Sequence, residues 1–209
     1  MIVTGLEELT KSRSKVFLDG EFAFVLYKGE LRHFHLKVDG EIAAQDYARI
    51  MEELLPKRAK LRAMNLLLKK DYTTAQLRKK LQEGGYPEEI ISLALEYVQS
   101  YHYTDDQRYA VNYIVFHQDQ KSKKRIEQDL RSRGISQEVM EKAWLQWEQE
   151  GGEQQEAEMI SKLLRKRKYD SESATPAERQ REYAFLMRKG FSSENVKKAV
   201  FGRHDTWMD

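Results

Sequence analysis

Hydrophobic residues follow two different periods along this chain of 209 residues. Over the first forty residues they fall in short runs that alternate with polar residues, which is typical of half-buried β-strands. From Ile42 onward they recur at intervals of three and four residues, the period of an amphipathic helix. The change of period predicts a small β element followed by a much longer helical region, so we expect a mainly α fold.

The first forty residues carry a hairpin signal. Two β-prone runs flank Asp19-Gly20, and Asp-Gly is a preferred sequence for a two-residue hairpin turn. A further run over residues 31–38 has alternating apolar positions and predicts another strand; these positions are Phe34, Leu36 and Val38. We therefore expect a small N-terminal antiparallel β element over residues 1–40.

One local pattern occurs three times in the helical region, each time around a glycine. An apolar residue lies four positions before the glycine and another directly after it, followed by a glutamate at plus four, an apolar residue at plus six and an alanine at plus nine. The glycines are Gly85, Gly134 and Gly190, spaced 49 and 56 residues apart. Glycine adopts the left-handed backbone that ends many helices, so each pattern predicts a helix, a glycine stop and a second helix. Periods of this length are typical of stacked helical units.

Start and stop signals divide the helical region further. Residues 43–55 predict one helix that Pro56 ends or kinks. Residues 57–71 predict a second helix, with Leu61, Met64 and Leu68 as its buried stripe. Capping sequences begin further helices at Thr73, Thr104 and Thr175. A polar loop over residues 169–175 accounts for the longer third copy, and residues 202–209, apart from Trp207, carry no pattern.

These signals predict a tandem array of three three-helix repeat units behind the β element. The expected domains are a β-rich extension over 1–42, a linker helix with the first repeat over 43–103, the second repeat over 104–151, and the third repeat with a tail over 152–209. An array of like units presents a surface to a partner and has no obvious place for a deep catalytic pocket. The organisation favours a binding protein, which we expect to be a monomer, over an enzyme.

Composition narrows the class of protein. Charged residues make up 33% of the chain, hydrophobic residues 40%, and cysteine is absent. No apolar run approaches the length of a membrane span, and the N-terminus lacks the regions of a secretory signal. We therefore expect a cytoplasmic protein without disulfides or thiolate metal sites. Phosphate-cradling and dinucleotide-binding glycine motifs are missing from the sequence as well, so we expect no cofactor and no catalytic residues.

The net charge is only +2, but the basic residues are clustered. Three clusters, within residues 57–80, 121–133 and 162–168, lie near matching points of the repeat and would create local fields that attract phosphates or an acidic protein surface. The candidate partner-binding or DNA-binding residues are Lys60, Arg78, Lys79, Lys123, Lys124, Arg125, Arg131, Arg133, Arg165, Arg167 and Lys168. Charge runs on helices are also ordinary solvated faces, and the charge pattern alone leaves both explanations open.

Other candidate groups fit structural roles better. Several aromatic residues could stack on bases, namely Tyr72, Tyr103, Tyr109, Tyr113, Trp144 and Trp147, but most fall on apolar helical faces and are expected in the core. Asp105 and Asp106 fall in the first turn of a helix, where the macrodipole stabilises negative charge. His33 and His35 would share one strand face, but no third ligand lies nearby, so we expect no metal site.

Four segments, in this order and spacing, resemble the RecX family of bacterial regulators of the recombinase RecA. They are AMNLL at 63–67 with YTTAQLRKKL at 72–81, YTDDQRYA at 103–110, IEQDLRSRGI at 126–135 and FLMRKGF at 185–191. The resemblance covers residues 57–201. Thr104 and Tyr109 stand where the family often has leucine and phenylalanine, and the first forty residues lie outside the shared region.

The resemblance implies a negative modulator that binds RecA filaments on single-stranded DNA and limits filament extension, ATP hydrolysis and strand exchange. Family members are thought to touch both protein and DNA, so single-stranded DNA is a candidate second partner. Two alternatives stay open. Each repeat has two helices joined by a short glycine turn, as in helix-turn-helix DNA-binding proteins. A purely protein-binding helical adaptor would also fit the pattern.

Overall fold

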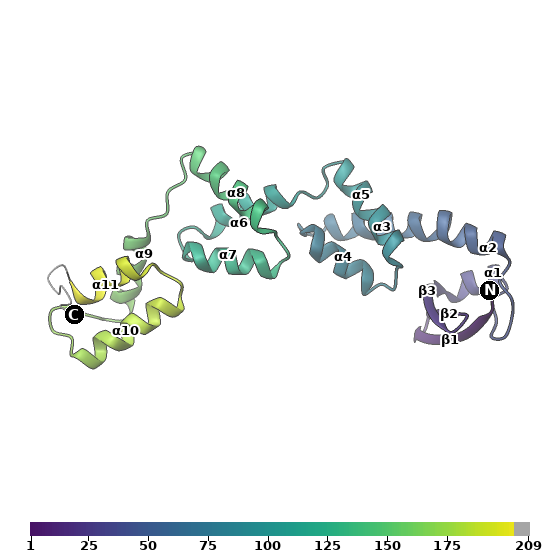
Figure 1. The fold of residues 1–209 in the computed structure, drawn as a ribbon, viewed down its shortest axis with the longest axis horizontal. Helices are drawn as coiled ribbons and strands as arrows, with labels where there is room; N and C mark the ends of the chain where they lie inside the picture. Colours follow the sequence, from purple (N-terminus) through teal and green to yellow (C-terminus); the bar gives the residue numbers. More distant parts are fainter. Residues whose placement is uncertain (203–209) are drawn as a thin grey trace. The chain divides into compact units, whose positions relative to one another are not determined.

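The computed structural model describes residues 1–202, so Trp207 and the rest of residues 203–209 lie outside the described residues. The chain divides into two compact units, Met1–Asp105 and Asp106–Asp209. Three hydrophobic cores follow one another along the sequence, the first in one unit and the other two in the second. Figure 1 shows one small sheet followed by helices, which confirms the mainly α fold.

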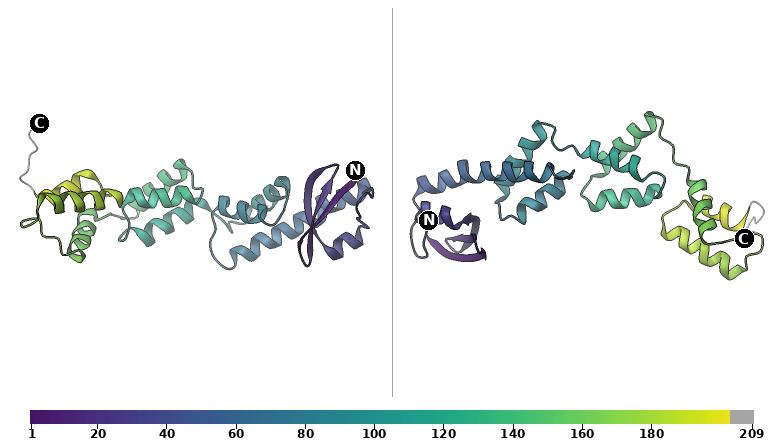
Figure 2. Two further views of the ribbon diagram at one scale, coloured as in Figure 1. Left: turned by 90° about the horizontal axis from the view of Figure 1, so that it is seen from below. Right: turned by 180° about the vertical axis from the view of Figure 1, so that it is seen from behind.

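An antiparallel sheet of three strands opens the chain, with β1 (Val3–Thr10), β2 (Arg13–Leu18) and β3 (Glu21–Tyr27) in that order across the sheet. Figure 2 shows the three strands side by side. Asp19 and Gly20 have φ angles of 49° and 93°, the positive pair that a type I′ turn requires. The predicted hairpin is therefore confirmed. β1 lacks a clear signal because Val3 is its one fully buried residue.

The strand predicted over residues 31–38 is wrong, because α1 (Lys28–His33) begins the segment. The backbone N–H of Tyr27 donates to Glu30 Oε2 at 2.7 Å and caps the helix start. Leu31 and Phe34 are three residues apart, so they share the helical face that packs on the core.

The end of α1 explains the alternating pattern. His35 has a φ of 51°, which turns the chain so that Leu36 is buried beside Phe34. Val38 is 48% exposed. His33 lies on the helix and His35 in the turn beyond it, so the two histidines do not share a strand face.

The long helical segment that follows α1 continues through Pro56. α2 (Ala44–Ala48), the π-helical segment η1 (Arg49–Leu54) and α3 (Leu55–Leu67) follow one another without a break, so the proline does not end the helix there. Proline clashes with the carbonyl four residues earlier in an α-helix, and a wide π turn changes that geometry. Pro56 also stands in the first turn of α3, a position where proline is well tolerated.

The buried stripe predicted for α3 is wrong at two of its three positions, since Met64 packs against the core but Leu61 and Leu68 do not. Leu61 is 53% exposed and Leu68 83% exposed, whereas Ala59 and Ala63 are fully buried. α3 packs on α5 (Glu88–Ser100), and small residues at such a contact let two helices approach closely. Hydrophobicity alone favoured the leucines, but close helix packing selects the alanine face.

The sheet and the first repeat share one core, and Arg58 of α3 joins them. Its Nη2 donates to the carbonyl of Val25 at 2.5 Å, and its Nη1 lies 2.7 Å from Glu30 Oε2. The guanidinium also lies 5.1 Å from the Tyr27 ring centre and 5.4 Å from that of Tyr86. One cation therefore connects β3, α1 and the turn that precedes α5.

Each repeat is a triplet of helices in which the first and third pack against one another. The first consists of α3, α4 (Thr74–Gln82) and α5, and the second of α6 (Asp106–His117), α7 (Lys123–Ser132) and α8 (Gln137–Gln149). The third consists of α9 (Glu156–Lys166), α10 (Pro176–Arg188) and α11 (Ser193–Phe201). The capping boxes predicted at Thr73 and Thr175 are confirmed.

The repeat glycines end the middle helices as predicted. Gly85, Gly134 and Gly190 have φ angles of 77°, 81° and 83°. In each turn the backbone N–H of the residue that follows the glycine donates to the carbonyl of the residue four positions before the glycine. This is the hydrogen bond of a Schellman motif. These bonds are Tyr86 to Leu81 at 3.4 Å, Ile135 to Leu130 at 3.1 Å and Phe191 to Leu186 at 3.4 Å. The two apolar residues of the repeat pattern, four positions before and one after each glycine, are thus joined by this backbone hydrogen bond.

The buried carboxylate of Glu182 holds the third repeat together. Glu182 is 4% exposed, and Arg167 donates to its two oxygens at 2.5 and 2.8 Å. These hydrogen bonds lower the pKa of Glu182, although burial opposes the shift. A buried carboxylate without its cation would be strongly unfavourable.

We predict that Gly85→Ala lowers the free energy of unfolding of the first compact unit by more than Gly20→Ala does. Both sites have positive φ, which costs about 1–2 kcal/mol for alanine. A Cβ at Gly85 would also lie 2.2 Å from Val25 Cγ2, whereas none of the described atoms lies within 4 Å of one at Gly20. Hydrogen exchange followed over residues 1–105 measures the difference. Equal effects would contradict the close packing of this turn on β3.

We also predict that Arg167→Ala lowers the free energy of unfolding at neutral pH by about 1–3 kcal/mol, because it leaves the buried Glu182 with the longer contact to Arg181 Nε at 3.6 Å in place of two close hydrogen bonds. Lys166→Ala, at an exposed neighbouring position, is the control and should change it by less than about 0.5 kcal/mol. A carboxylate with a depressed pKa stabilises the fold above its unfolded pKa and loses that effect as the pH falls. The gap between wild type and Arg167→Ala should therefore narrow below about pH 4. Urea denaturation followed by circular dichroism tests both statements, and equal effects of the two variants would refute them.

Candidate functional site

Some of the predicted binding residues form an ion pair with a carboxylate of this chain, and others do not. Four have an acidic partner, namely Arg78 with Glu88, Lys123 with Glu148 at 3.8 Å, Arg125 with Asp129 at 3.3 Å and Arg167 with Glu182 at 2.5 Å. A cation with a carboxylate in contact attracts an external anion less strongly, because the two local charges largely cancel. Arg167 in particular is part of the third repeat's own structure.

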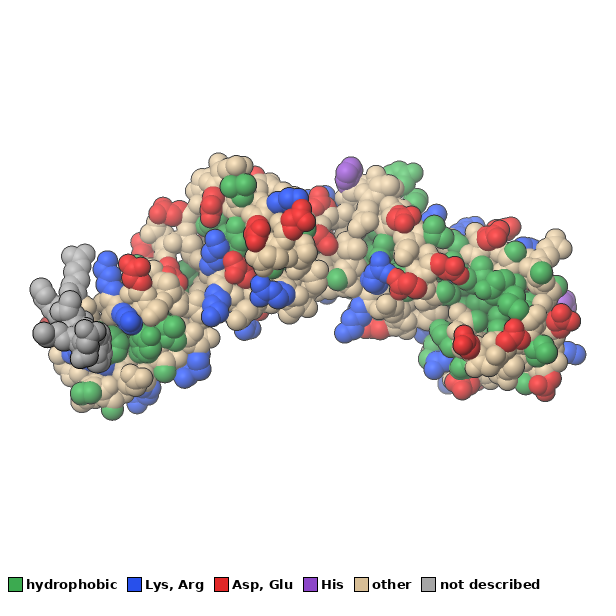
Figure 3. All heavy atoms as spheres, in the orientation of Figure 1, with side chains coloured by type: hydrophobic (Ala, Val, Ile, Leu, Met, Phe, Trp, Pro, Cys, Tyr) green, Lys and Arg blue, Asp and Glu red, His purple; other side chains and the backbone are tan. Residues whose placement is uncertain are grey.

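Six other candidates have no acidic partner within residues 1–202. They are Lys60 and Lys79 in the first repeat, Lys124 and Arg131 in the second, and Arg165 and Lys168 in the third. The ammonium of Lys60 lies 5.0 Å from the Tyr97 ring centre, and Arg131 donates to Gln137 Oε1 at 3.1 Å. On the face drawn in Figure 3, Lys and Arg side chains lie among Asp and Glu side chains. These six candidates are spread over all three repeats, two in each.

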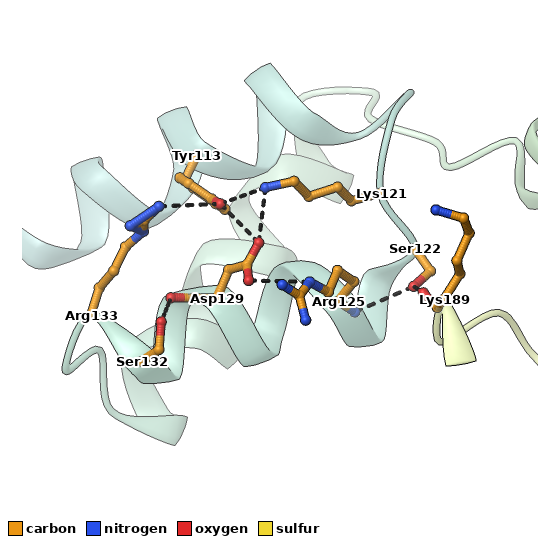
Figure 4. A network of polar contacts seen from close by, with 8 residues as sticks. All are labelled: Tyr113, Lys121, Ser122, Arg125, Asp129, Ser132, Arg133 and Lys189. Carbon is orange, nitrogen blue, oxygen red and sulfur yellow. Dashed lines mark hydrogen bonds and ion pairs between the residues drawn. The ribbon is translucent and has the colours of Figure 1, made fainter. Parts of the chain in front are cut away.

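A polar network between α6 and α7 fixes several of the basic side chains of the second repeat (Figure 4). Lys121 Nζ donates to Asp129 Oδ2 and to the Tyr113 hydroxyl, both at 2.8 Å, and that hydroxyl donates to Asp129 at 3.0 Å. Burial opposes ionisation of Lys121, but hydrogen bonds to Asp129 and Tyr113 outweigh it and raise the pKa of Lys121. The same hydrogen bonds outweigh burial at Asp129 and lower its pKa.

Arg133 extends this network, so its role in the second repeat is partly structural. Its Nη2 lies 3.5 Å from the Tyr113 hydroxyl, and its guanidinium lies 4.7 Å from the centre of the Tyr113 ring. The same ring lies 4.2 Å from that of His117, whose pKa is lowered by burial and by the charges of Lys121 and Arg133. Tyr113 is therefore held between charged partners and does not form an open stacking surface.

The start of α7 reverses the usual charge preference of a helix. Its first turn contains Lys123, Lys124 and Arg125 and no acidic residue. The helix macrodipole disfavours cations at this end by up to about 1 kcal/mol each. By contrast, α8, α9, α10 and α11 each carry a glutamate in the first turn. A local arrangement that costs stability indicates a role other than folding.

A cleft of about 420 Å³ lies where the start of α7 meets the turn that ends α10. The Ser122 hydroxyl, 1% exposed, donates to the carbonyl of Lys189 at 2.7 Å and accepts the N–H of Arg125 at 3.3 Å (Figure 4). A Cβ at Gly190 would lie 2.9 Å from the same hydroxyl oxygen. The two helix ends are thus fixed in contact by a buried serine and a glycine.

Four cations line this cleft, namely Lys121, Arg125, Arg188 and Lys189. Sequence reasoning identified Arg125 alone among them. Arg188 and Lys189 directly precede the third repeat glycine, and that position could have drawn attention to them. Nothing local in the sequence shows that they meet Lys121 from the second repeat.

The glycine turn of the first repeat also borders a cleft of about 420 Å³. Arg13, Arg62 and Lys80 line it together with Tyr86. It contains a carboxylate as well, since Glu83 accepts a hydrogen bond from Lys80 at 2.6 Å. Two of the repeat glycines therefore stand beside basic clefts, of which the one in the second compact unit is richer in positive charge.

Among the other sequence candidates, the two tryptophans are core residues and Tyr103 lies at the surface. Trp144 and Trp147 are each 5% exposed and pack edge to face in the core of the second repeat, as expected. Tyr103 is 46% exposed and stacks on Tyr101, with ring centres 5.6 Å apart. Asp106 begins α6. Within residues 1–202 no helix is long and apolar enough to cross a membrane.

Comparison with known proteins gives matches along most of the chain. The profiles of the first, second and third three-helix domains of RecX match residues 59–97, 105–143 and 153–200. Each match falls within one of the three repeats described above.

Curated relatives match nearly the whole of this chain. A regulatory protein RecX from Caldanaerobacter subterraneus subsp. tengcongensis is 30% identical over 202 residues, which is 96% of this chain and 98% of the relative. A protein of the same name from Limosilactobacillus reuteri is 31% identical over 93% of this chain and 75% of its own length. An alignment over 96% of the chain has to include most of residues 1–40, so the expectation that these lie outside the shared region is wrong.

Solved structures of RecX proteins match this chain as well. A crystal structure of regulatory protein RecX has a TM-score of 0.61 and 26% identity, and the match covers 95% of this chain and 98% of that one. RecX from Lactobacillus salivarius has the same fold, with a TM-score of 0.57 and 20% identity over 70% of this chain and 94% of that one. The three domain matches and the full-length relatives together show that this chain belongs to the RecX family of regulatory proteins.

Proposed function

We propose that this chain is a negative modulator of the recombinase RecA. It binds RecA filaments on single-stranded DNA through basic side chains of its helical repeats and limits filament extension, ATP hydrolysis and strand exchange. The observation that supports this best is that each of the three repeats carries two of the predicted binding residues that have no acidic partner within residues 1–202. A partner that is itself a repeating polymer offers matching anionic groups at successive positions.

Binding alone accounts for such an effect. A protein that occupies the surface of a filament obstructs the addition of recombinase subunits and the movement that accompanies ATP hydrolysis. Several weak contacts joined in one chain reinforce one another, because each bound repeat raises the effective concentration of the next. We propose that the units over 43–103, 104–151 and 152–209 act in this way in the cytoplasm, as a monomer, with residues 1–42 packed on the first.

Two alternative functions make different predictions for the tests below. A helix-turn-helix protein would prefer one DNA sequence over random duplex, because specificity requires contacts to base edges. A protein adaptor without nucleic-acid contact would bind with little dependence on salt.

Inhibition of RecA-driven ATP hydrolysis on single-stranded DNA should weaken by about tenfold or more between about 50 and 200 mM salt, because each neutralised phosphate releases counterions. The measurement is the concentration for half-maximal inhibition at each salt concentration, corrected for the salt dependence of RecA alone. Inhibition that is unchanged over this range would contradict binding through the cations and favour the adaptor.

Charge reversal at Lys79, Arg131 and Arg165, one site in each repeat, should raise the concentration for half-maximal inhibition by about tenfold. It should also reduce the salt slope by about one for each phosphate-binding side chain that is replaced. These residues avoid Lys123 and Arg125, whose reversal would also break contacts with Glu148 and Asp129. The matched control is charge reversal at Lys11, Lys37 and Lys197, three exposed lysines without an acidic partner among residues 1–202, which makes the same change of net charge.

Both triple variants should unfold at temperatures close to that of the wild type, since the altered side chains are exposed. A triple variant at Lys79, Arg131 and Arg165 that inhibits as strongly as the control would show that these residues are not the contact surface.

A further inference from the structure

We propose that the cleft beside Gly190 is a binding site for the phosphodiester backbone of single-stranded nucleic acid. This inference rests on the proposed function and assigns direct DNA contact to one place in the second compact unit. The site consists of Lys121, which lies just before α7, of Arg125 in the first turn of α7, and of Arg188 and Lys189 at the end of α10.

The charge in this cleft is poorly neutralised. Among contacts within residues 1–202, Asp129 is the single carboxylate that touches any of the four cations, and it is shared between Lys121 and Arg125. Arg188 and Lys189 have no acidic partner among the described residues, and the ammonium of Lys189 lies 5.2 Å from the Phe185 ring centre. A concave surface lined by one sign of charge concentrates the field and attracts the opposite charge.

The cations at the end of α10 and those at the start of α7 have opposite effects on the stability of their helices. Cations at the end of α10 are favourable for the helix itself, because they complement the negative end of its macrodipole. Cations at the start of α7 are unfavourable for the same reason. An anion in the cleft would offset part of that penalty, since it would lie beside the side chain of Arg125 in that first turn.

The cleft is also held in place without a ligand. The hydrogen bond from Ser122 to the Lys189 carbonyl joins the two helix ends, and Gly190 leaves room for it. Lys121 is fixed by Asp129 and the Tyr113 hydroxyl. Donors that are positioned before binding lose less conformational entropy when a phosphate arrives.

The walls of the cleft indicate recognition of the backbone and not of bases. Phe191 is the aromatic residue among those that line it, and this side chain is 4% exposed and packs in the core of the third repeat. Without an exposed ring, bases have no stacking surface there, whereas Arg and Lys interact with every phosphate alike. The site should therefore bind without regard to sequence.

The test is the affinity of the full chain, without RecA, for a fluorescently labelled oligothymidine measured by anisotropy. Arg188→Gln with Lys189→Gln should weaken binding by about fivefold or more and lower the salt slope by about two. The control is Lys197→Gln with Lys198→Gln, two exposed residues of α11 in the same repeat with the same loss of charge. The control should bind within about twofold of wild type, and both variants should retain the wild-type melting temperature.

Two further oligomers distinguish binding to the phosphate backbone from binding to the bases. An oligomer with an uncharged methylphosphonate backbone should bind the wild type and the Arg188/Lys189 variant equally, and a mixed-sequence oligomer should behave like oligothymidine. Weaker binding of the uncharged oligomer by the variant than by the wild type, or absence of oligothymidine binding by the wild type, would overturn the proposal.

Inhibition of RecA ATP hydrolysis is measured with the same variants. If the Arg188/Lys189 variant binds oligothymidine normally but no longer inhibits, these residues contact an acidic protein surface; the phosphate site is then wrong while the proposed function stands. If it no longer binds oligothymidine and still inhibits, the phosphate site stands and binding through DNA is not the basis of RecA modulation.

Discussion

The left-handed glycine between the second and third helices of each repeat is the constraint on which the rest of the structure depends. It lets the chain reverse within a few residues and pairs the apolar side chains on either side of the turn. Two of these turns also meet the preceding part of the chain. Gly85 approaches Val25 of β3, and Gly190 approaches Ser122 at the start of α7. One backbone geometry therefore builds the repeats and brings elements distant in sequence together.

This constraint also determines where charge accumulates. The turn at Gly190 places Arg188 and Lys189 beside a helix start that already carries three cations. Other basic residues are balanced by local carboxylates, as Arg167 is by Glu182 and Arg58 by Glu30. The basic side chains thus form two populations, one that stabilises the repeats and one that remains available to a partner. A net charge of +2 conceals this division, because it sums over both.

The sequence predicted those features that depend on local chemistry. The Asp19-Gly20 turn, the caps at Thr73 and Thr175 and the glycine stops each follow from the preferences of a few neighbouring residues. Prediction failed where tertiary packing decides. Alternating Phe34 and Leu36 fitted a strand, but they flank a turn after α1, and close packing on α5 buries the alanines of α3 instead of Leu61 and Leu68. The pairing of Arg125 with Asp129, four residues apart on a helix, was within reach of sequence rules. The cleft was not, since Lys121 and Lys189 are brought near each other by the contact of Ser122 with the α10 turn.

The proposed function, binding along a filament through unpaired cations, requires a partner that engages all three repeats matched by the RecX domain profiles. Hydrogen exchange of the full chain, with and without RecA filaments assembled on single-stranded DNA, measures this engagement most directly. Slower exchange is expected in all three repeats, and above all in the first turn of α7 and in the turn around Gly190. Protection confined to the N-terminal sheet, or to one repeat, would contradict a contact surface distributed along the array.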